Sequence, residues 1–122
     1  MVKDIEIDET EEFQKIGRAN GHYPFPTVAF FNYPHVPCMV SFNSKATALL
    51  EGVDNLAIRV GKSHILFIPA KPGMSSRHIC RTRGAAKIAC RELGLFVKSR
   101  TRFRAYPYKG GIVIKRNEPL SD

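Results

Sequence analysis

Residues 56–68 read LAIRVGKSHILFI, and this stretch decides the fold that we predict for the chain. Residues 56–60 alternate apolar and polar side chains, which is the period of a strand with one buried face. Residues 64–68 form a more continuous apolar run that is also typical of a strand. Because residues 61–63 have the length and composition of a tight turn, we predict an antiparallel hairpin here.

The segment before this hairpin predicts two strands and a short helix. Residues 27–31 and 38–42 are rich in β-branched and aromatic side chains, so we expect a strand in each. Either residue of the polar pair 43–44 is a good N-cap for a short helix over residues 45–51. Gly52 follows where a left-handed helix terminus is expected.

The segment after the hairpin predicts a longer helix and two further strands. Residues 81–93 read as an amphipathic helix that Gly94 closes. Its apolar stripe would consist of Ala85, Ile88, Ala89 and Leu93. A turn at residues 109–111 separates a strand over residues 100–106 from one over residues 112–114. The predicted fold class is therefore α+β, with an antiparallel sheet or small barrel, one short helix and one longer helix.

The chain of 122 residues has the length of one domain. We divide it into an acidic and Pro/Gly-rich N-terminal segment, residues 1–26, and a single α+β domain, residues 27–122. Within that domain we expect a hairpin unit over residues 38–71 and a helix plus strand pair over residues 77–116. No internal repeat or low-complexity tract argues for a different division.

The charge of the chain is strongly basic and unevenly distributed. Lys and Arg number 19 against 11 Asp and Glu, which gives a net charge of +8 and a pI near 9.7. Residues 1–12 hold six acids against one base, so they carry −5, and residues 13–122 carry +13. The acidic stretch is either a solvated tail or a segment that folds back on the basic body. This balance excludes an acidic DNA mimic and favours nucleic acid, an anionic surface or an acidic protein face as partner.

Hydropathy and cysteine content indicate a cytoplasmic protein. No apolar run approaches the roughly 20 residues that cross a bilayer, so we expect no membrane association. The acidic N-terminal residues lack the apolar core of a signal peptide. Three cysteines are an odd count, which argues against a disulfide framework.

Two groups of basic residues have regular spacing and are the candidate binding residues. Arg83, Lys87 and Arg91 would lie along one face of the predicted helix, opposite its apolar stripe. Arg100, Arg102 and Arg104 would lie on one face of the predicted strand, which Tyr106 continues and Tyr108 flanks.

Repeated cations on one face repel each other and contribute nothing to folding. A sequence that tolerates them in two neighbouring elements therefore suggests an anionic partner, and the preference for Arg favours phosphate or carboxylate recognition. The alternative is a face that is basic only for solubility.

Two short pairs of metal-ligating residues predict a structural zinc site. His35 and Cys38 have His-x-x-Cys spacing, and His78 and Cys80 have His-x-Cys spacing. Two nitrogens and two sulfurs complete a tetrahedral zinc site. The alternative is that the cysteines pack in the core and the histidines are exposed. Cys90 is most simply a small core residue.

No complete catalytic motif is present, and we predict a binding protein rather than an enzyme. Nucleophile-elbow, metalloprotease and Walker sequences are absent from the chain. Gly61-Lys62-Ser63 matches the end of a phosphate-binding loop, but a hairpin turn explains it better. The four predicted zinc ligands would leave no open position for metal catalysis.

Residues 38–71 resemble the swapped-hairpin unit of AbrB-type transition regulators. The shared plan is a strand at residues 39–42, a short helix at residues 46–50 and two hairpin strands. Those regulators carry an Ile-Pro-x-x-x-Arg start and a Gly-Asp pair that this chain lacks, so we do not assign DNA reading to this unit. The resemblance implies a homodimer, because such hairpins complete their barrel with a second chain.

The whole pattern is similar to a class of short proteins encoded by phages and other mobile elements. The matching residues are Ser41-Phe42-Asn43, Ala46-x-x-Leu49-Leu50, Leu56-Ala57-Ile58, Arg77-x-Ile79, Ala86-x-Ile88-Ala89, Glu92-Leu93-Gly94 and Arg102-Phe103-Arg104-x-Tyr106. The resemblance implies an accessory protein that acts by binding nucleic acid or a nucleic-acid-bound host protein. The alternative it implies is an inhibitor of a host RNA-guided nuclease, of the anti-CRISPR type, that zinc would stabilise.

Overall fold

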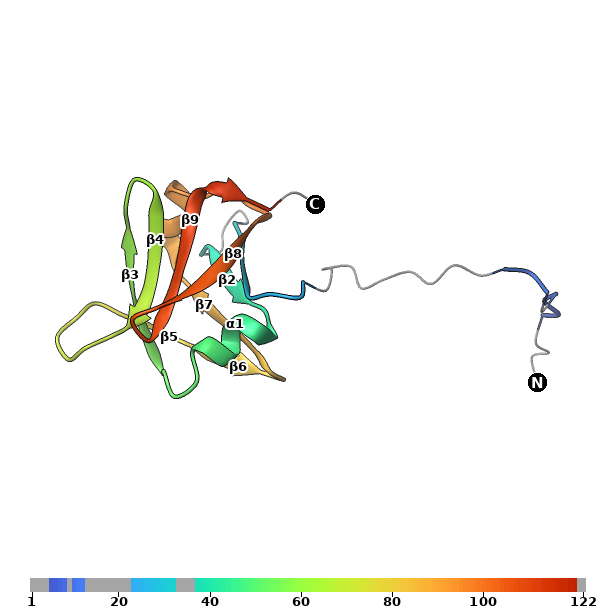
Figure 1. The fold of residues 1–122 in the computed structure, drawn as a ribbon, viewed down its shortest axis with the longest axis horizontal. Helices are drawn as coiled ribbons and strands as arrows, with labels where there is room; N and C mark the ends of the chain where they lie inside the picture. Colours follow the sequence, from blue (N-terminus) through green and yellow to red (C-terminus); the bar gives the residue numbers. More distant parts are fainter. Residues whose placement is uncertain (1–4, 9, 13–22, 33–36, 121–122) are drawn as a thin grey trace.

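The computed structural model describes residues 5–8, 10–12, 23–32 and 37–120. In this part of the chain the strands form one antiparallel sheet that curls into a nearly closed barrel (Figure 1). In chain order the elements are β1 (Thr27–Phe31), β2 (Met39–Phe42), α1 (Ser44–Leu49), β3 (Asn55–Val60), β4 (His64–Pro69), β5 (Arg77–His78), β6 (Cys80–Thr82), β7 (Ala85–Ala89), the 3-10 helix η1 (Arg91–Leu95), β8 (Thr101–Tyr108) and β9 (Gly111–Pro119).

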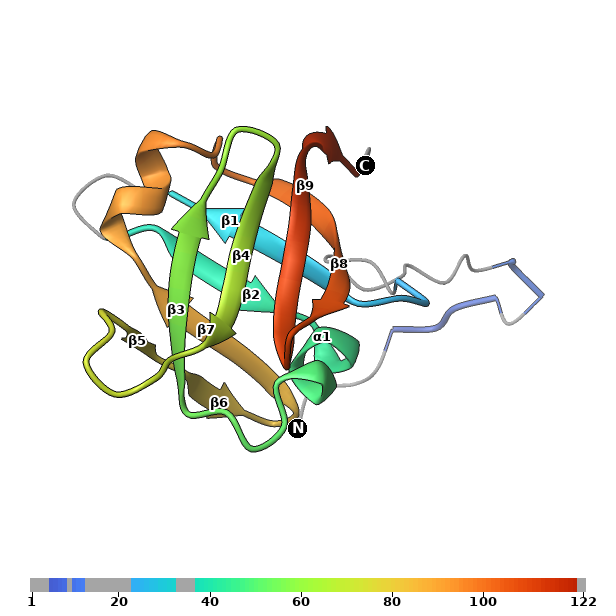
Figure 2. The same cartoon turned by 60° about the vertical axis from the view of Figure 1, so that its left-hand side comes forward.

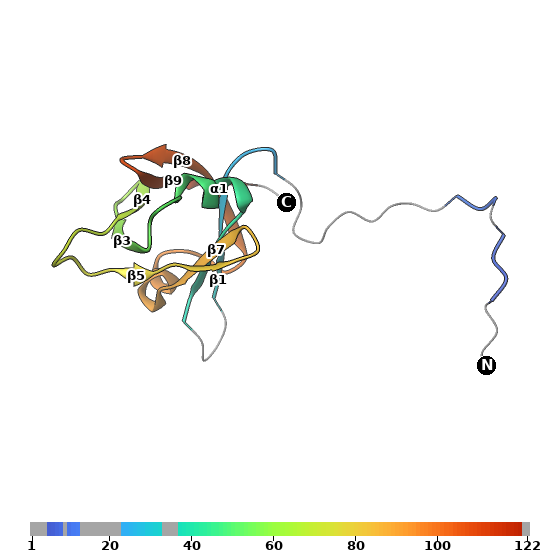
Figure 3. The same cartoon turned by 90° about the horizontal axis from the view of Figure 1, so that it is seen from below.

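The order of strands across the sheet is β5-β3-β4-β9-β8-β1-β2-β7-β6. Figure 2 shows β3, β4 and β9 side by side on the near wall, with β1, β2 and β7 crossing behind them. Helix α1 lies at one end of the barrel and contacts β1, β2, β7 and β9 (Figure 3).

A single extended segment, residues 77–82, brings the two ends of the sheet together. Its first part, β5, pairs with β3, and its second part, β6, pairs with β7. Ile79 lies between the two parts, and its side chain is buried. The backbone N–H of Ile79 donates to the carbonyl of Asp54 at 2.8 Å, so the segment stays bonded where it changes partner. This change of partner nearly closes the wall, with β5 paired to Asn55 and Leu56 at the start of β3.

The interior of the barrel is filled by alternate side chains of the strands. Phe67 meets Phe42 edge to face at 5.6 Å between ring centroids, and Phe30 meets Phe103 in the same way at 5.6 Å. Aliphatic residues of β2, β4, β7 and β9 complete the core around these rings. Because alternate residues of each strand face inward, the residues between them must face outward.

The prediction of a long helix over residues 81–93 is wrong, and with it the α+β fold class. This segment forms β6, a turn, β7 and then η1. Arg83 and Gly84 both have positive φ, at 50° and 78°, as the two central residues of a hairpin turn with right-handed twist require. Ala86 and Ile88 of β7 are buried while the residues on either side of each are exposed. Over the described residues the fold is therefore a nearly closed β-barrel with one short α-helix and one 3-10 helix.

The other predicted elements of residues 27–68 are confirmed. Strands β1 and β2, the hairpin of β3 and β4, and the short helix lie within a residue or two of their expected positions. The Asn43 side chain caps α1 by accepting from the N–H of Ala46 at 2.9 Å, and it also accepts from the N–H of Thr27 at 3.0 Å. The same amide therefore starts the helix and ties it to β1. Neither helix of the described residues has the length and apolarity to cross a membrane.

A substitution in the β6–β7 turn tests the strand assignment, because a hairpin and a helix predict stability changes of opposite sign. We expect Gly84→Ala to destabilise the protein by about 1–2 kcal/mol, because alanine is strained at positive φ. Beyond its chain neighbours nothing lies within 4 Å of the added methyl position, so no clash adds to the backbone strain. Urea unfolding of the two proteins measures the difference. A helix over residues 81–93 would instead be stabilised by this change by about 1 kcal/mol, and that result would contradict the hairpin.

Candidate nucleic-acid interface

The outer face of β8 carries the basic residues that the strand spacing predicted. Phe103 and Ala105 are buried inside the barrel, whereas Arg104 is exposed and Arg102 and Tyr106 are half-buried outside it. The predicted alternation of this strand is therefore confirmed from Arg102 onward. Arg100 precedes the strand with a φ of 62°, and its N–H donates to the carbonyl of Phe30 at 2.7 Å. It is thus not part of the regular face.

The first predicted basic group is not assembled as expected, because the helix that would align it does not exist. Arg83 lies in the β6–β7 turn, Lys87 lies on β7, and Arg91 is the first residue of η1. All three are exposed, but they belong to different local structures. Their spacing of four residues therefore does not place them on one face.

Sheet register nevertheless places Lys87 on the outer surface that Arg102 shares. Lys87 pairs with Ser41, Ser41 with Ala29, and Ala29 with Arg102. Residues paired in this way project from the same side of a sheet, and three strand spacings separate Lys87 from Arg102 by about 14 Å. The two predicted groups thus contribute one shared outer row, although the helix argument for it was wrong.

Cations and aromatic rings alternate along the outer face of β8. The Arg104 guanidinium lies 4.4 Å from the ring centre of Phe25 and 5.6 Å from that of Tyr106. Lys115 of β9 lies 5.1 Å from the ring centre of Tyr106. Arg102 lies 5.0 Å from the ring of Tyr23, which is itself 5.6 Å from Phe25. We call this set the cation–aromatic ladder; its members are Arg102, Tyr23, Phe25, Arg104, Tyr106 and Lys115.

The segment before β1 positions two rings of the ladder. The N–H of Ala105 donates to the carbonyl of Pro26 at 2.9 Å, which continues the β1–β8 pairing beyond the end of β1. The Asn43 side chain donates to the carbonyl of Phe25 at 3.0 Å. These two bonds hold Phe25 beside Arg104.

Sequence reasoning missed Tyr23, Phe25 and Lys115. The alternation of β1 could have indicated the two rings. Its odd-numbered residues face outward, and residues 23 and 25 continue this pattern toward the N-terminus. The same alternation, extended beyond residues 112–114, places Lys115 outside. The contact of Phe25 with Arg104 joins residues almost 80 positions apart, so no local pattern indicates it.

Other cations of the described region have structural roles. Arg81 donates to the carbonyl of Leu50 at 2.7 Å and to that of Val53, near the end of α1. Arg116 donates to the carbonyl of Gly61 at 2.6 Å and to that of Phe96 at 3.3 Å. Within the ladder, Lys115 lies 3.6 Å from the carboxylate of Glu118. Arg104, in contrast, is held by rings, and ring stacking leaves guanidinium N–H groups available at its edge.

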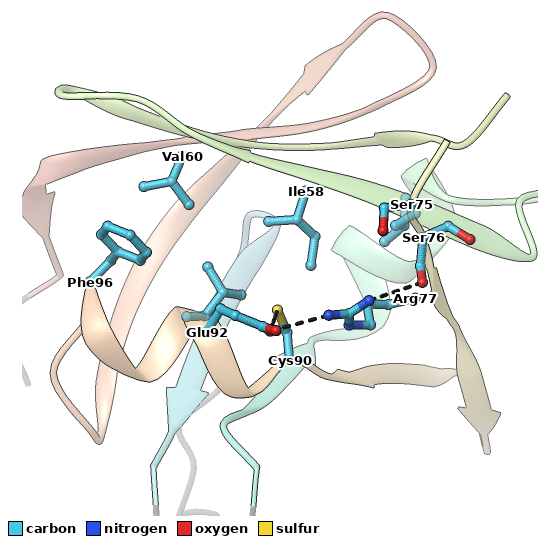
Figure 4. Close-up of a pocket in the computed structure, with 10 residues that line it drawn as sticks. Ile58, Val60, Ser75, Ser76, Arg77, Cys90, Glu92 and Phe96 are labelled. Atoms are coloured by element: carbon cyan, nitrogen blue, oxygen red, sulfur yellow. Dashed lines mark hydrogen bonds and ion pairs between the residues drawn. The ribbon is translucent and has the colours of Figure 1, made fainter. Parts of the chain in front are cut away.

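A pocket of about 220 Å³ lies between β3 and η1, away from the ladder (Figure 4). Arg77 and Glu92 form an ion pair of 3.1 Å at its rim, and the Cys90 thiol lies 3.4 Å from the same carboxylate oxygen. Hydrogen bonds from the backbone N–H of Glu92, then from Cys90 and Arg77, lower the pKa of Glu92. Burial raises the pKa of Cys90, so its reactive thiolate form is disfavoured.

The predicted zinc ligands do not come together in the described residues. Cys38 is buried and opposes Cys90, whose N–H donates to the Cys38 carbonyl at 2.8 Å. Cys80 is exposed and pairs with Lys87 on the outer side of the wall. His78 is exposed on β5, and His35 lies outside the described residues. No group of three or more potential ligands occurs among the side chains that the structure describes, and zinc content stays a prediction.

Comparisons of the chain with protein-family models, curated proteins and solved structures found no match.

Thiol reactivity tests the placement of the three cysteines. We expect one equivalent of a maleimide reagent to react with the native protein at pH 7.5, at exposed Cys80. Cys38 and Cys90 should react only after unfolding, because burial hides both sulfurs and raises the pKa of both thiols. Intact mass spectrometry counts the adducts, and Cys80→Ser is the control that should show none. Rapid native labelling of all three would contradict the barrel register of β2 and β7.

Proposed function

We propose that this protein is a non-enzymatic binding protein whose cation–aromatic ladder engages nucleic acid. The observation that carries the proposal is the position of Arg104 between Phe25 and Tyr106 on the outer wall of the barrel. A stacked guanidinium has already lost much of its side-chain freedom, so its contact with a phosphate costs less ordering entropy.

The charge of the barrel supports the same proposal. Residues 23–32 and 37–120 hold 16 Lys and Arg against four Asp and Glu. Within the described part of the chain, carboxylates form ion pairs with Arg77 and Lys115. The remaining positive field attracts polyanions and raises their rate of association.

The similarity to short phage proteins supports a role as a mobile-element accessory protein in the cytoplasm. The free cysteines Cys38, Cys80 and Cys90 suit a reducing compartment. An accessory protein of this kind would bind free nucleic acid or the nucleic acid held by a host nucleoprotein. Inhibition of an RNA-guided nuclease is the competing function, and the experiment below separates the two.

Replacing Arg104 tests the ladder directly. We expect Arg104→Gln to weaken binding of a fluorescein-labelled 12-mer of deoxythymidine about tenfold at 50 mM salt, the loss typical of one charge-assisted contact. The slope of log K against log salt should fall in magnitude by about 0.7, the contribution of one phosphate on a single strand. Fluorescence anisotropy at four salt concentrations measures both quantities.

The matched control is Arg83→Asn, which removes the same charge from the β6–β7 turn. Asparagine tolerates the positive φ of that position, so the turn is preserved. We expect this variant to bind within twofold of the unmodified protein. Equal losses in the two variants would show that net charge, rather than the ladder, determines binding. Salt-independent binding, or capture of a guide-loaded nuclease by a protein that binds no free nucleic acid, would reject the proposal.

A further inference from the structure

The outer face of β4 and β9 is apolar where the outer face of a barrel is ordinarily polar. Ile65 and Phe67 of β4 fill the interior. Leu66 and Ile68, which alternate with them, face outward, yet they are also apolar and are half-buried. Val113 of β9 has the same outward position between two buried isoleucines. Antiparallel strands with one solvated face normally alternate apolar and polar residues. The continuous apolar runs in these strands therefore indicate that both of their faces are used.

Sheet register arranges these residues in a row across four strands. Arg59 of β3 pairs with Leu66, and Leu66 pairs with Val113. Val113 pairs in turn with Tyr106, a member of the ladder. The row spans about 14 Å at the usual strand spacing. It begins with a cation, continues through two aliphatic side chains and ends at an aromatic ring.

Two surface hollows include residues of this row. The first has a volume of about 440 Å³, and its lining includes Arg59, His64, Leu66, Tyr108 and Val113. The second, of about 540 Å³, shares Arg59 and is also lined by Ile68, Lys71, Met74 and Lys109. We call the two hollows together the trough.

Gly111 allows close packing of the strands beneath the trough. It pairs with Tyr108 of β8. A Cβ at this position would lie 2.1 Å from the carbonyl oxygen of Phe67, so β4 and β9 approach closely only because residue 111 is glycine.

The trough has apolar and aromatic surfaces inside a cationic border. Arg59 stands on one side, Lys109 lies 5.4 Å from the ring centre of Tyr108 at one end, and Lys115 with Arg104 lies toward the other. Nucleobases present flat apolar faces and nucleic-acid backbones present phosphates, so an unpaired strand complements both parts of this surface. Duplex nucleic acid offers mainly phosphates to such a surface, because its base faces are stacked within the helix.

The spacing of the two tyrosines favours an unstacked strand. Tyr106 and Tyr108 project from the same side of β8, two residues and about 6.8 Å apart. This is about twice the 3.4 Å rise between stacked bases of one DNA strand. Consecutive bases can therefore each face a ring only when the strand is extended.

A second copy of this chain is a poorer occupant of the trough. A twofold interface brings the same patch of both chains together, so the cations around the trough would face one another. That arrangement costs Coulomb energy that a polyanionic partner would instead gain.

On these grounds we propose that the trough binds the bases of single-stranded nucleic acid while the ladder binds its phosphates. This inference rests on the proposed function and specifies its substrate class. The bases would stack on Tyr106 and Tyr108 and lie against Leu66 and Val113. Arg59 and Lys109 would contact phosphates on either side.

The test compares a 12-mer of deoxythymidine with a 12-base-pair duplex in the same buffer. We expect the unmodified protein to bind the single strand at least tenfold more tightly. Tyr108→Ala should weaken single-strand binding about 5- to 150-fold, the range for loss of one base–aromatic stack. It should leave the salt dependence unchanged, because tyrosine carries no charge, and should change duplex binding less than twofold.

Two further variants keep the test falsifiable. Leu66→Thr retains a good strand former and should weaken single-strand binding about threefold or more, while Phe96→Ala removes an exposed ring that lines the pocket between β3 and η1 rather than the trough and should have no effect. This inference would be overturned if the protein bound single strand and duplex equally and Tyr108→Ala left both affinities unchanged. That result would leave the ladder proposal standing. A dimer that Leu66→Thr dissociates would also overturn it. Loss of all nucleic-acid binding from the unmodified protein would reject both.

Discussion

The hydrogen bonding of residues 77–82 to both ends of the sheet is the constraint on which the rest of the structure depends. Because β5 pairs with β3 and β6 pairs with β7, the sheet becomes a wall with an inside and an outside. In each strand, alternate side chains then pack around the phenylalanine rings of the core, and the side chains between them face outward. The ladder and the trough lie on the outward side of this wall, which Figures 1 and 2 show as a ribbon, and the pairings of β3, β4, β9 and β8 set the register of their strands.

Local patterns were sufficient for about half of the fold. The hairpin of residues 56–68 and the helix that Asn43 caps are specified by turn and cap residues within a few positions, so they could be predicted. The prediction for residues 81–93 was wrong because the spacing of alanine and isoleucine there is compatible with the apolar face of a helix and with that of a strand. What decides between them is the pairing of Ile88 with Val40, a contact almost 50 residues away, together with positive φ at Arg83 and Gly84. The outward position of Arg102 and Arg104 was predictable from the strand period, whereas the rings that hold them come from a distant segment.

The ladder and the trough form one surface that runs across β8, β9, β4 and β3. Tyr106 connects the two, since it contacts Arg104 and Lys115 of the ladder and also pairs with Val113, which lines the trough. Its ring therefore lies where a cationic strip of the surface meets an apolar one. A solvated basic face explains the cations but not Leu66 and Val113 between them. A hydrophobic docking face explains those two residues but not the cations, and a single-stranded polyanion accounts for both.

The central claim, that nucleic acid binds across the outer face of β8, β9 and β4, is tested most directly by mapping amide chemical shifts. The ¹⁵N-labelled protein would be titrated with a short oligomer of deoxythymidine. We predict that the largest changes occur at Leu66, Tyr106, Tyr108 and Val113, while the β6–β7 turn and η1 stay unchanged. Changes concentrated at Arg83 and Arg91, or an unchanged spectrum at saturating oligomer, would contradict the account.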